Sequence, residues 1–88
     1  MEYILDVSNL KSCSAFHARL KEILPFPAWY GGNLDAMYDC LTDLPRGTFL
    51  RIRGFTALET HLGQRYTAKL RRVLNDAAAE GCFGWAEE

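Results

Sequence analysis

The sequence is poor in cysteine and has none of the cysteine spacings that hold a metal. Its three cysteines are Cys13, Cys40 and Cys82, and no C-x-x-C pair occurs. An odd number in a chain without a secretion signal favours free thiols over a disulfide framework, so we expect small core side chains. Cys13 and His17 could share a helix face, but two ligands make only half of a zinc site. We therefore expect neither a metal nor a cofactor.

Long apolar segments are also missing. No run approaches the roughly 18 residues that a membrane span needs. The first seven residues, Met1 to Val7, lack the basic segment and long apolar stretch of a secretory signal. We therefore expect a cytoplasmic protein without a membrane partner. The 88 residues, 49% hydrophobic and 24% charged, predict a single globular domain over 1–88.

Net charge is small, at −1, but the charges are segregated. Residues 22–45 carry four acids and no Lys or Arg, whereas in residues 46–72 the cations oppose Glu59 alone. Blocks of one sign steer association with a partner of opposite charge. An RNA-associated regulatory protein that binds through the basic face of residues 46–72 is the alternative function. A pI near 6 and the lack of an RNA-binding motif argue against direct nucleic-acid binding.

Hydrophobic spacing alternates between the periods of strands and of helices. This order predicts an α/β domain with a parallel sheet and right-handed crossovers. The expected strands cover residues 3–7, 48–53 and 82–86, and the expected helices begin after a cap at Ser12 or Ser14, after Asn33, near Ala57 and after Gly63, the last helix ending at Gly81.

The expected helix over residues 33–43 carries three aspartates at four-residue spacing, Asp35, Asp39 and Asp43. This spacing places them on one face, where like charges cost about 0.2 to 0.5 kcal/mol per pair. Asp43 also lies toward the unfavourable C-terminal end of the helix dipole. The opposite face should pack on the core through Leu34, Met37, Tyr38 and Leu41. The acidic face is therefore expected in solvent.

Catalysis is an unfavoured interpretation of these carboxylates. A catalytic pair needs surroundings that separate the two pKa values, and an exposed helix face does not supply them. His17 and His61 lie on different expected helices, outside any nucleophile motif. We expect no enzyme. Trp29, Tyr30 and Tyr38 beside the carboxylates instead indicate a protein-binding surface for a partner with a cationic cleft.

The run Trp-Tyr-Gly-Gly-Asn-Leu-Asp-Ala-Met-Tyr-Asp-Cys-Leu-Thr at residues 29–42 resembles the signature of the barstar family, intracellular inhibitors of the ribonuclease barnase. The resemblance extends over nearly the whole chain. It implies a three-layer α/β fold, with a three-stranded parallel β-sheet and about four α-helices. It also implies an inhibitor or immunity protein that blocks a barnase-like secreted ribonuclease or toxin nuclease with the helix over 33–43 and the preceding loop.

The resemblance also assigns roles to residues. It implies that Asp39 enters the phosphate site of the nuclease, with Asp35 as a second anchor. Gly32, Tyr38, Asp43 and Leu44 depart from the family pattern at the rim of the implied binding surface, with Leu44 at its edge, which leaves the identity of the nuclease open. The expected partner-binding residues are Trp29, Tyr30, Gly31, Asn33, Asp35, Tyr38, Asp39, Thr42, Asp43, Asp76 and Glu80.

Overall fold

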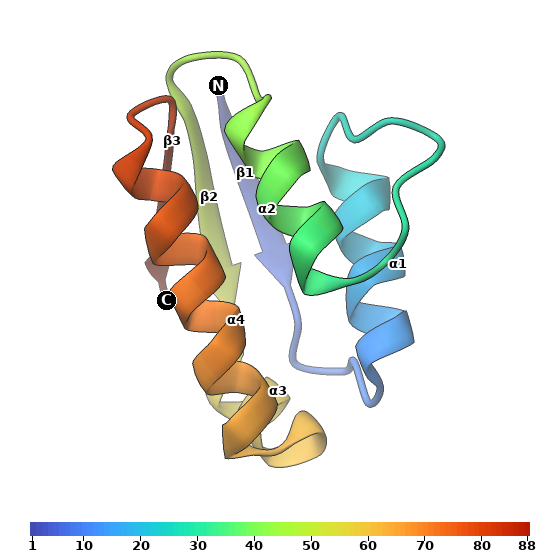
Figure 1. The fold of residues 1–88 in the computed structure, drawn as a ribbon. Coiled ribbons are helices and arrows are strands. Elements are labelled where there is room, and N and C mark those ends of the chain that lie inside the picture. The colour runs from blue at the N-terminus through green and yellow to red at the C-terminus, as the bar shows by residue number, and fades with distance from the viewer.

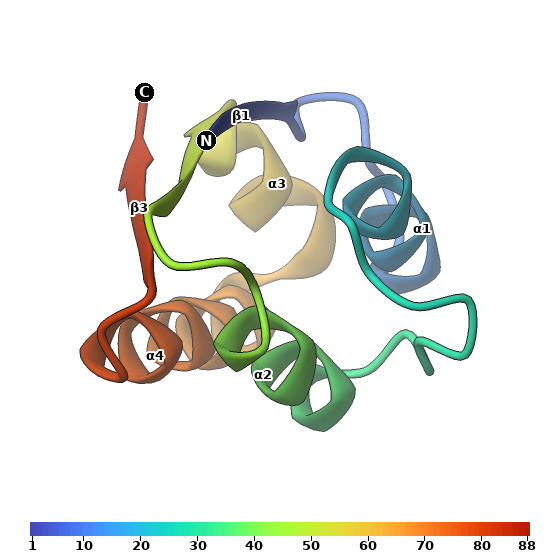
Figure 2. The ribbon, with the colours of Figure 1, turned by 90° about the horizontal axis from the view of Figure 1, so that it is seen from above.

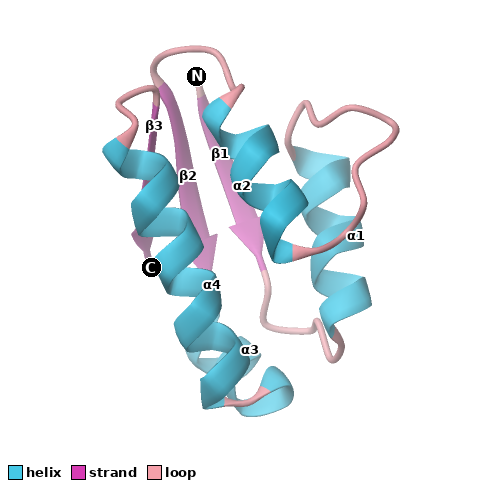
Figure 3. Ribbon diagram, in the orientation of Figure 1, coloured by secondary structure: helices cyan, strands magenta, loops and turns pink.

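The computed structural model describes residues 1–88 and contains three strands and four helices, as predicted (Figures 1 and 3). None of the four helices is long and apolar enough to cross a membrane. In chain order the elements are β1 (Glu2–Asp6), α1 (Cys13–Ile23), α2 (Leu34–Thr42), β2 (Thr48–Arg53), α3 (Phe55–Leu62), α4 (Gln64–Ala79) and β3 (Phe83–Glu87).

The sheet is parallel throughout and has the order β1-β2-β3, which confirms the predicted fold class. Its central strand places Leu50 between Tyr3 of β1 and Trp85 of β3. Both connections step in the same direction across the sheet. Because such crossovers are almost always right-handed, both carry their helices to the same face. Figure 2 shows all four helices on one side of the sheet.

The helices on this face lie at two depths. Helix α1 contacts β1 and α4 contacts β3, whereas α2 packs mainly against α4. Figure 2 shows α2 farther from the sheet than either of these helices. The three layers are therefore the sheet, the helices α1 and α4, and α2 outside them. Residues on the outer side of α2 belong to the surface and not to the packing of the sheet.

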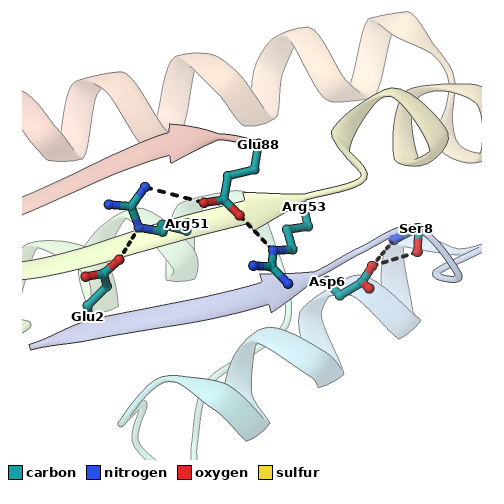
Figure 4. Close-up of polar contacts among 6 residues, drawn as sticks. All are labelled: Glu2, Asp6, Ser8, Arg51, Arg53 and Glu88. Carbon is teal, nitrogen blue, oxygen red and sulfur yellow. Dashed lines mark hydrogen bonds and ion pairs between the residues drawn. The ribbon is translucent and has the colours of Figure 1, made fainter.

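The opposite face of the sheet is open to solvent. Leu50 and Ile52 of β2 point to the helices and are fully buried, while Arg51 and Arg53 between and after them point outward, as their alternation predicts. Arg51 pairs with Glu2 and Glu88, and Nε of Arg53 donates to Glu88 at 2.7 Å (Figure 4). Two of the cations in residues 46–72 are thus paired with acids on the open face.

Side-chain caps set the first turns of helices α1 and α2. The Ser12 side chain accepts from the backbone N–H of Ala15 at 3.0 Å and begins α1. Asn33 caps α2 in the same way, accepting from the N–H of Ala36 at 2.8 Å. These contacts satisfy backbone donors that have no partner inside a helix. Both caps were predicted, Ser12 as one of two alternatives.

Expectations about side-chain burial are wrong for two of the cysteines and for Leu44. The cysteines were expected in the core, but only Cys40 is buried; Cys82 is half-buried and Cys13 is exposed. Cys13 is the first residue of α1, at the end of the helix, where neighbours cover it on fewer sides. Leu44 was expected at the edge of the binding surface, yet it is only 6% exposed and belongs to the core cluster.

An acidic cleft between two helices

Helices α2 and α4 pack side by side and leave a cleft of about 460 Å³ along their outer surface. Three of its lining residues are carboxylates, one is a tyrosine and two are aliphatic. The six residues are Leu34, Asp35, Tyr38 and Asp39 from α2, and Val73 and Asp76 from α4. The structure therefore brings four of the predicted site residues together, although Asp76 comes from a distant part of the sequence.

The orientation of α2 follows from its buried residues. Met37, Cys40 and Leu41 are at most 3% exposed and hold one face of the helix on the core. Asp35 and Asp39, one turn apart, then point away from the core and are exposed. Asp35 also lies in the first turn, where the helix dipole favours a negative charge. Core packing thus sets which side chains α2 presents in the cleft.

The carboxylates of the cleft form no ion pairs. The four ion pairs of the protein use Arg51, Arg53 and Arg71, and none involves a cleft carboxylate. Helices α2 and α4 run in the same direction (Figure 1), so the negative ends of both helix dipoles lie at the same end of the helix pair. The last turns of both helices contain no basic residue. The three carboxylates therefore give the cleft a negative charge that no ion pair ties down.

Tyr38 reports this negative charge. Partial desolvation raises the pKa of its hydroxyl, and the carboxylates of Glu80, Asp76 and Asp39 raise it further. The phenol therefore stays neutral near pH 7 and can donate a hydrogen bond. A cleft with several carboxylate oxygens and one phenol suits a guanidinium or ammonium group, which forms charge-assisted hydrogen bonds with carboxylates.

The cleft is not arranged as a metal centre. No group of three or more His, Cys, Asp or Glu residues in the structure could hold a metal ion. The sequence also suggested Cys13 and His17 as half of a metal site. Both ring nitrogens of His17, however, lie within hydrogen-bond distance of tyrosine hydroxyls.

The loop between α1 and α2 carries the next group of predicted residues. Trp29 is 71% exposed, which makes it one of the most exposed large apolar side chains of the protein. Gly31 and Asn33 are also exposed. Gly32, between them, has φ 69°, a conformation that L side chains rarely adopt. The loop thus ends in a left-handed turn that leads directly into the N-terminus of α2.

Tyr30 does not lie on this exposed surface, contrary to expectation. Only 8% of it is accessible, and its ring packs edge-on against Phe26 with centroids 4.8 Å apart. Its hydroxyl lies 2.5 Å from Nδ1 of His17. The side chain points inward because this hydrogen bond and the apolar contacts can be made only beneath the loop. Its side chain therefore offers a partner little surface.

Three predicted residues lie at the other end of α2 and outside the cleft lining. The hydroxyl of Thr42 donates to the backbone carbonyl oxygens of Tyr38 and Asp39, at 3.1 and 3.0 Å. Asp43 follows the last turn of α2 as its C-cap, and Glu80 has the same place in α4. Both carboxylates are exposed. They extend the negative surface beyond the cleft toward the C-terminal ends of the two helices.

Sequence reasoning missed residues that shape the site from below. Val73 forms part of the cleft, although its spacing identified it only as an apolar residue of α4. His17 and Tyr66 lie behind the loop, where the imidazole contacts Tyr66 and Tyr30 together. No sequence signal pairs an imidazole with two distant phenols.

Comparison with known proteins agrees with this geometry. A family model described as Barstar (barnase inhibitor) matches residues 1–87. A Bacillus subtilis (strain 168) protein named "Putative ribonuclease inhibitor YrdF" is 38% identical over 80 residues, which cover 88% of this chain and 85% of that protein.

Proposed function

This chain belongs to the barstar family, and we propose from that premise that it is a protein inhibitor of a ribonuclease with a cationic active site. The observation that carries the proposal is the cleft between α2 and α4, where Asp35, Asp39 and Asp76 meet and none of them forms an ion pair within the protein. A ribonuclease binds the RNA phosphates with basic side chains. Carboxylates presented along a helix can occupy the places of these phosphates.

Inhibition in this proposal is steric and electrostatic. Helix α2 and the preceding loop enter the active site, with Asp39 in the phosphate site and Asp35 beside it. Trp29 packs on the enzyme surface, since an exposed aromatic side chain is a typical anchor of a protein interface. Asp43, Asp76 and Glu80 add negative charge around the contact. This negative charge accelerates encounter with a cationic partner, most strongly at low salt.

The same proposal names the class of nuclease and the place of action. The partner is a barnase-like secreted ribonuclease, or a toxin nuclease domain against which the chain confers immunity. Inhibition in the cytoplasm protects the RNA of the cell. The relationship to the protein named "Putative ribonuclease inhibitor YrdF" supports a ribonuclease as the target. Gly32 and Asp43, where the chain departs from the family pattern, lie next to the contact residues, which suits a partner other than barnase itself.

The alternative function, RNA association through residues 46–72, gains less support. Arg51 and Arg53 pair with Glu2 and Glu88 on the open face of the sheet, and Arg71 pairs with Glu87. These pairs remove three of the cations from a continuous basic surface. A protein that binds RNA through phosphate contacts would also show a steep dependence of affinity on salt, which a mobility-shift series measures.

Asp39→Ala tests the inhibitor proposal. We expect the parent protein to inhibit RNA cleavage by barnase or by another member of a panel of barnase-like ribonucleases and toxin nuclease domains. Loss of one partner from a buried charge pair costs about 2 to 5 kcal/mol, so the inhibition constant should rise roughly 30- to 5,000-fold. Glu22→Ala, which removes an exposed acid from α1, is the matched control and should inhibit like the parent. Equal inhibition by Asp39→Ala would refute the mechanism.

A further inference from the structure

A buried histidine joins the loop to two helices. His17 of α1 is 3% exposed, and it lies between a tyrosine of the loop and a tyrosine of α4. Its Nδ1 is 2.5 Å from the hydroxyl of Tyr30, and its Nε2 is 2.7 Å from the hydroxyl of Tyr66. Three segments that are distant in sequence thus meet at one imidazole ring.

In a neutral ring the two hydrogen bonds need a defined proton position. One nitrogen of a neutral imidazole donates and the other accepts, so one tyrosine hydroxyl accepts from the ring and the other donates to it. Burial lowers the pKa of His17 and so favours this neutral form. Burial also raises the pKa of Tyr66 to about 12 and raises that of Tyr30, which keeps both phenols protonated. The chain Tyr30–His17–Tyr66 is therefore intact near pH 7.

Few other contacts hold the loop. The backbone N–H of Tyr30 donates to the carbonyl of Pro27 at 3.0 Å, and the Lys21 ammonium donates to the carbonyl of Ala28 at 2.9 Å. Tyr30 is the only buried side chain of residues 25–33, and its ring packs against Phe26. Tyr30 lies directly between Trp29 and Gly31, so its position sets the direction in which the exposed Trp29 leaves the backbone.

We propose that His17 and Tyr66 are positioning residues of the partner-binding loop, which they hold through the hydroxyl of Tyr30. This inference rests on the proposed inhibitor function and identifies residues that support the contact surface without touching the partner. A loop that is already ordered loses less conformational entropy on association, and this preorganisation increases affinity. Tyr66 extends the support to α4, the helix that supplies Asp76 to the cleft, so loop and cleft share one frame.

The first test measures the order of the loop in the free protein, without any nuclease. Tyr30→Phe and Tyr66→Phe each remove one hydroxyl and leave the ring. Amide hydrogen exchange of residues 26–33, followed by mass spectrometry, should accelerate roughly 2- to 12-fold in Tyr30→Phe, which is the effect of one lost hydrogen bond. Tyr66→Phe should show a smaller increase, because this hydroxyl is only partly buried and water can replace it. The strands should exchange as in the parent.

Tyr3→Phe is the matched control. Its hydroxyl contacts the Met1 sulfur at 2.9 Å and no residue of the loop, so loop exchange should not change. Nitrogen NMR of the His17 ring supplies a signature that packing alone would not move. The parent should show one neutral tautomer, and Tyr66→Phe should shift the Nε2 resonance. Unchanged loop exchange in both variants, or acceleration spread evenly over the whole chain, would overturn the inference.

Inhibition assays separate this inference from the function on which it rests. If Tyr30→Phe and Tyr66→Phe loosen the loop and weaken inhibition, while the control does neither, the positioning role is supported. If they loosen the loop and inhibition is as strong as in the parent, the positioning role is wrong and the inhibitor function stands. If the parent inhibits no ribonuclease of the panel, the proposed function fails, whatever the exchange rates are.

Discussion

Replacing Asp39 with asparagine should stabilise the free protein while it removes the proposed function. Asp39 lies four residues from Asp35 and four from Asp43, so Asp39→Asn removes two like-charge pairs from α2. At about 0.2 to 0.5 kcal/mol per pair, the free energy of unfolding should rise by about 0.4 to 1 kcal/mol. Asparagine has nearly the helix propensity of aspartate, so propensity adds little. For a domain of this size the gain corresponds to about 2 to 8 °C in Tm.

Thermal unfolding followed by circular dichroism, at low salt and again at 1 M NaCl, measures this gain. Salt screens exposed charges, with a Debye length of about 3 Å at 1 M, so the gain should shrink there. Glu22→Gln is the control, because the residue one turn before Glu22 is Ala18 and no acid faces it. Its Tm should not rise. A Tm of Asp39→Asn at or below that of the parent at low salt would refute the argument that the acidic face is kept at the expense of stability.

Two further predictions concern the fold. Gly54 has φ 82°, and a Cβ there would lie 2.7 Å from Cβ of Ser8, so Gly54→Ala should lower the urea-derived free energy of unfolding by about 2 kcal/mol or more. Gly47 has φ 90° with open space around it, so Gly47→Ala should lower the same free energy by only about 1 kcal/mol. Equal losses in the two variants would contradict the proposed clash. Burial lowers the pKa of His17, so the unfolded chain binds a proton at this imidazole more readily than the folded chain does. The contribution of His17 to the free energy of unfolding is therefore complete above the ordinary pKa of 6.5, and it declines as the pH falls below that value. Thermal melts of the parent between pH 7.5 and 5 should show this decline and those of His17→Gln should lack it; parallel curves would refute the assignment.

The features that the sequence predicts well are those set by neighbouring residues. Asn33 and Ser12 act as caps because their side chains bond to backbone groups three residues away. The strand over 48–53 was predicted with its full length, because alternation of Leu50 and Ile52 with arginines reflects the two faces of a single strand. The fold class followed from the order of elements and from the handedness of crossovers.

The features that escaped prediction depend on contacts between distant segments. Tyr30 lies in a loop rich in proline and glycine, where a polar aromatic side chain is expected to be exposed. Its burial is explained by its contact with His17 beneath the loop. The sequence places Asp35 and Asp39 on one face, but their assembly with Asp76 depends on how α2 packs against α4. Before the structure, Asp76 entered the site through family resemblance alone. That all helices lie on one face could have been deduced from two right-handed crossovers, given the strand order.

The outer position of α2 has a consequence for how the inhibitor surface can change during evolution. The inner side of this helix is fixed by the core, but Asp35 and Asp39 on its outward side are exposed. Substitutions there alter the partner surface at little cost to folding, as most surface changes do. An inhibitor that must keep pace with a diverging nuclease can thus accumulate differences on one side of one helix. The core beneath α2 stays unchanged while the sequence of the recognised enzyme changes.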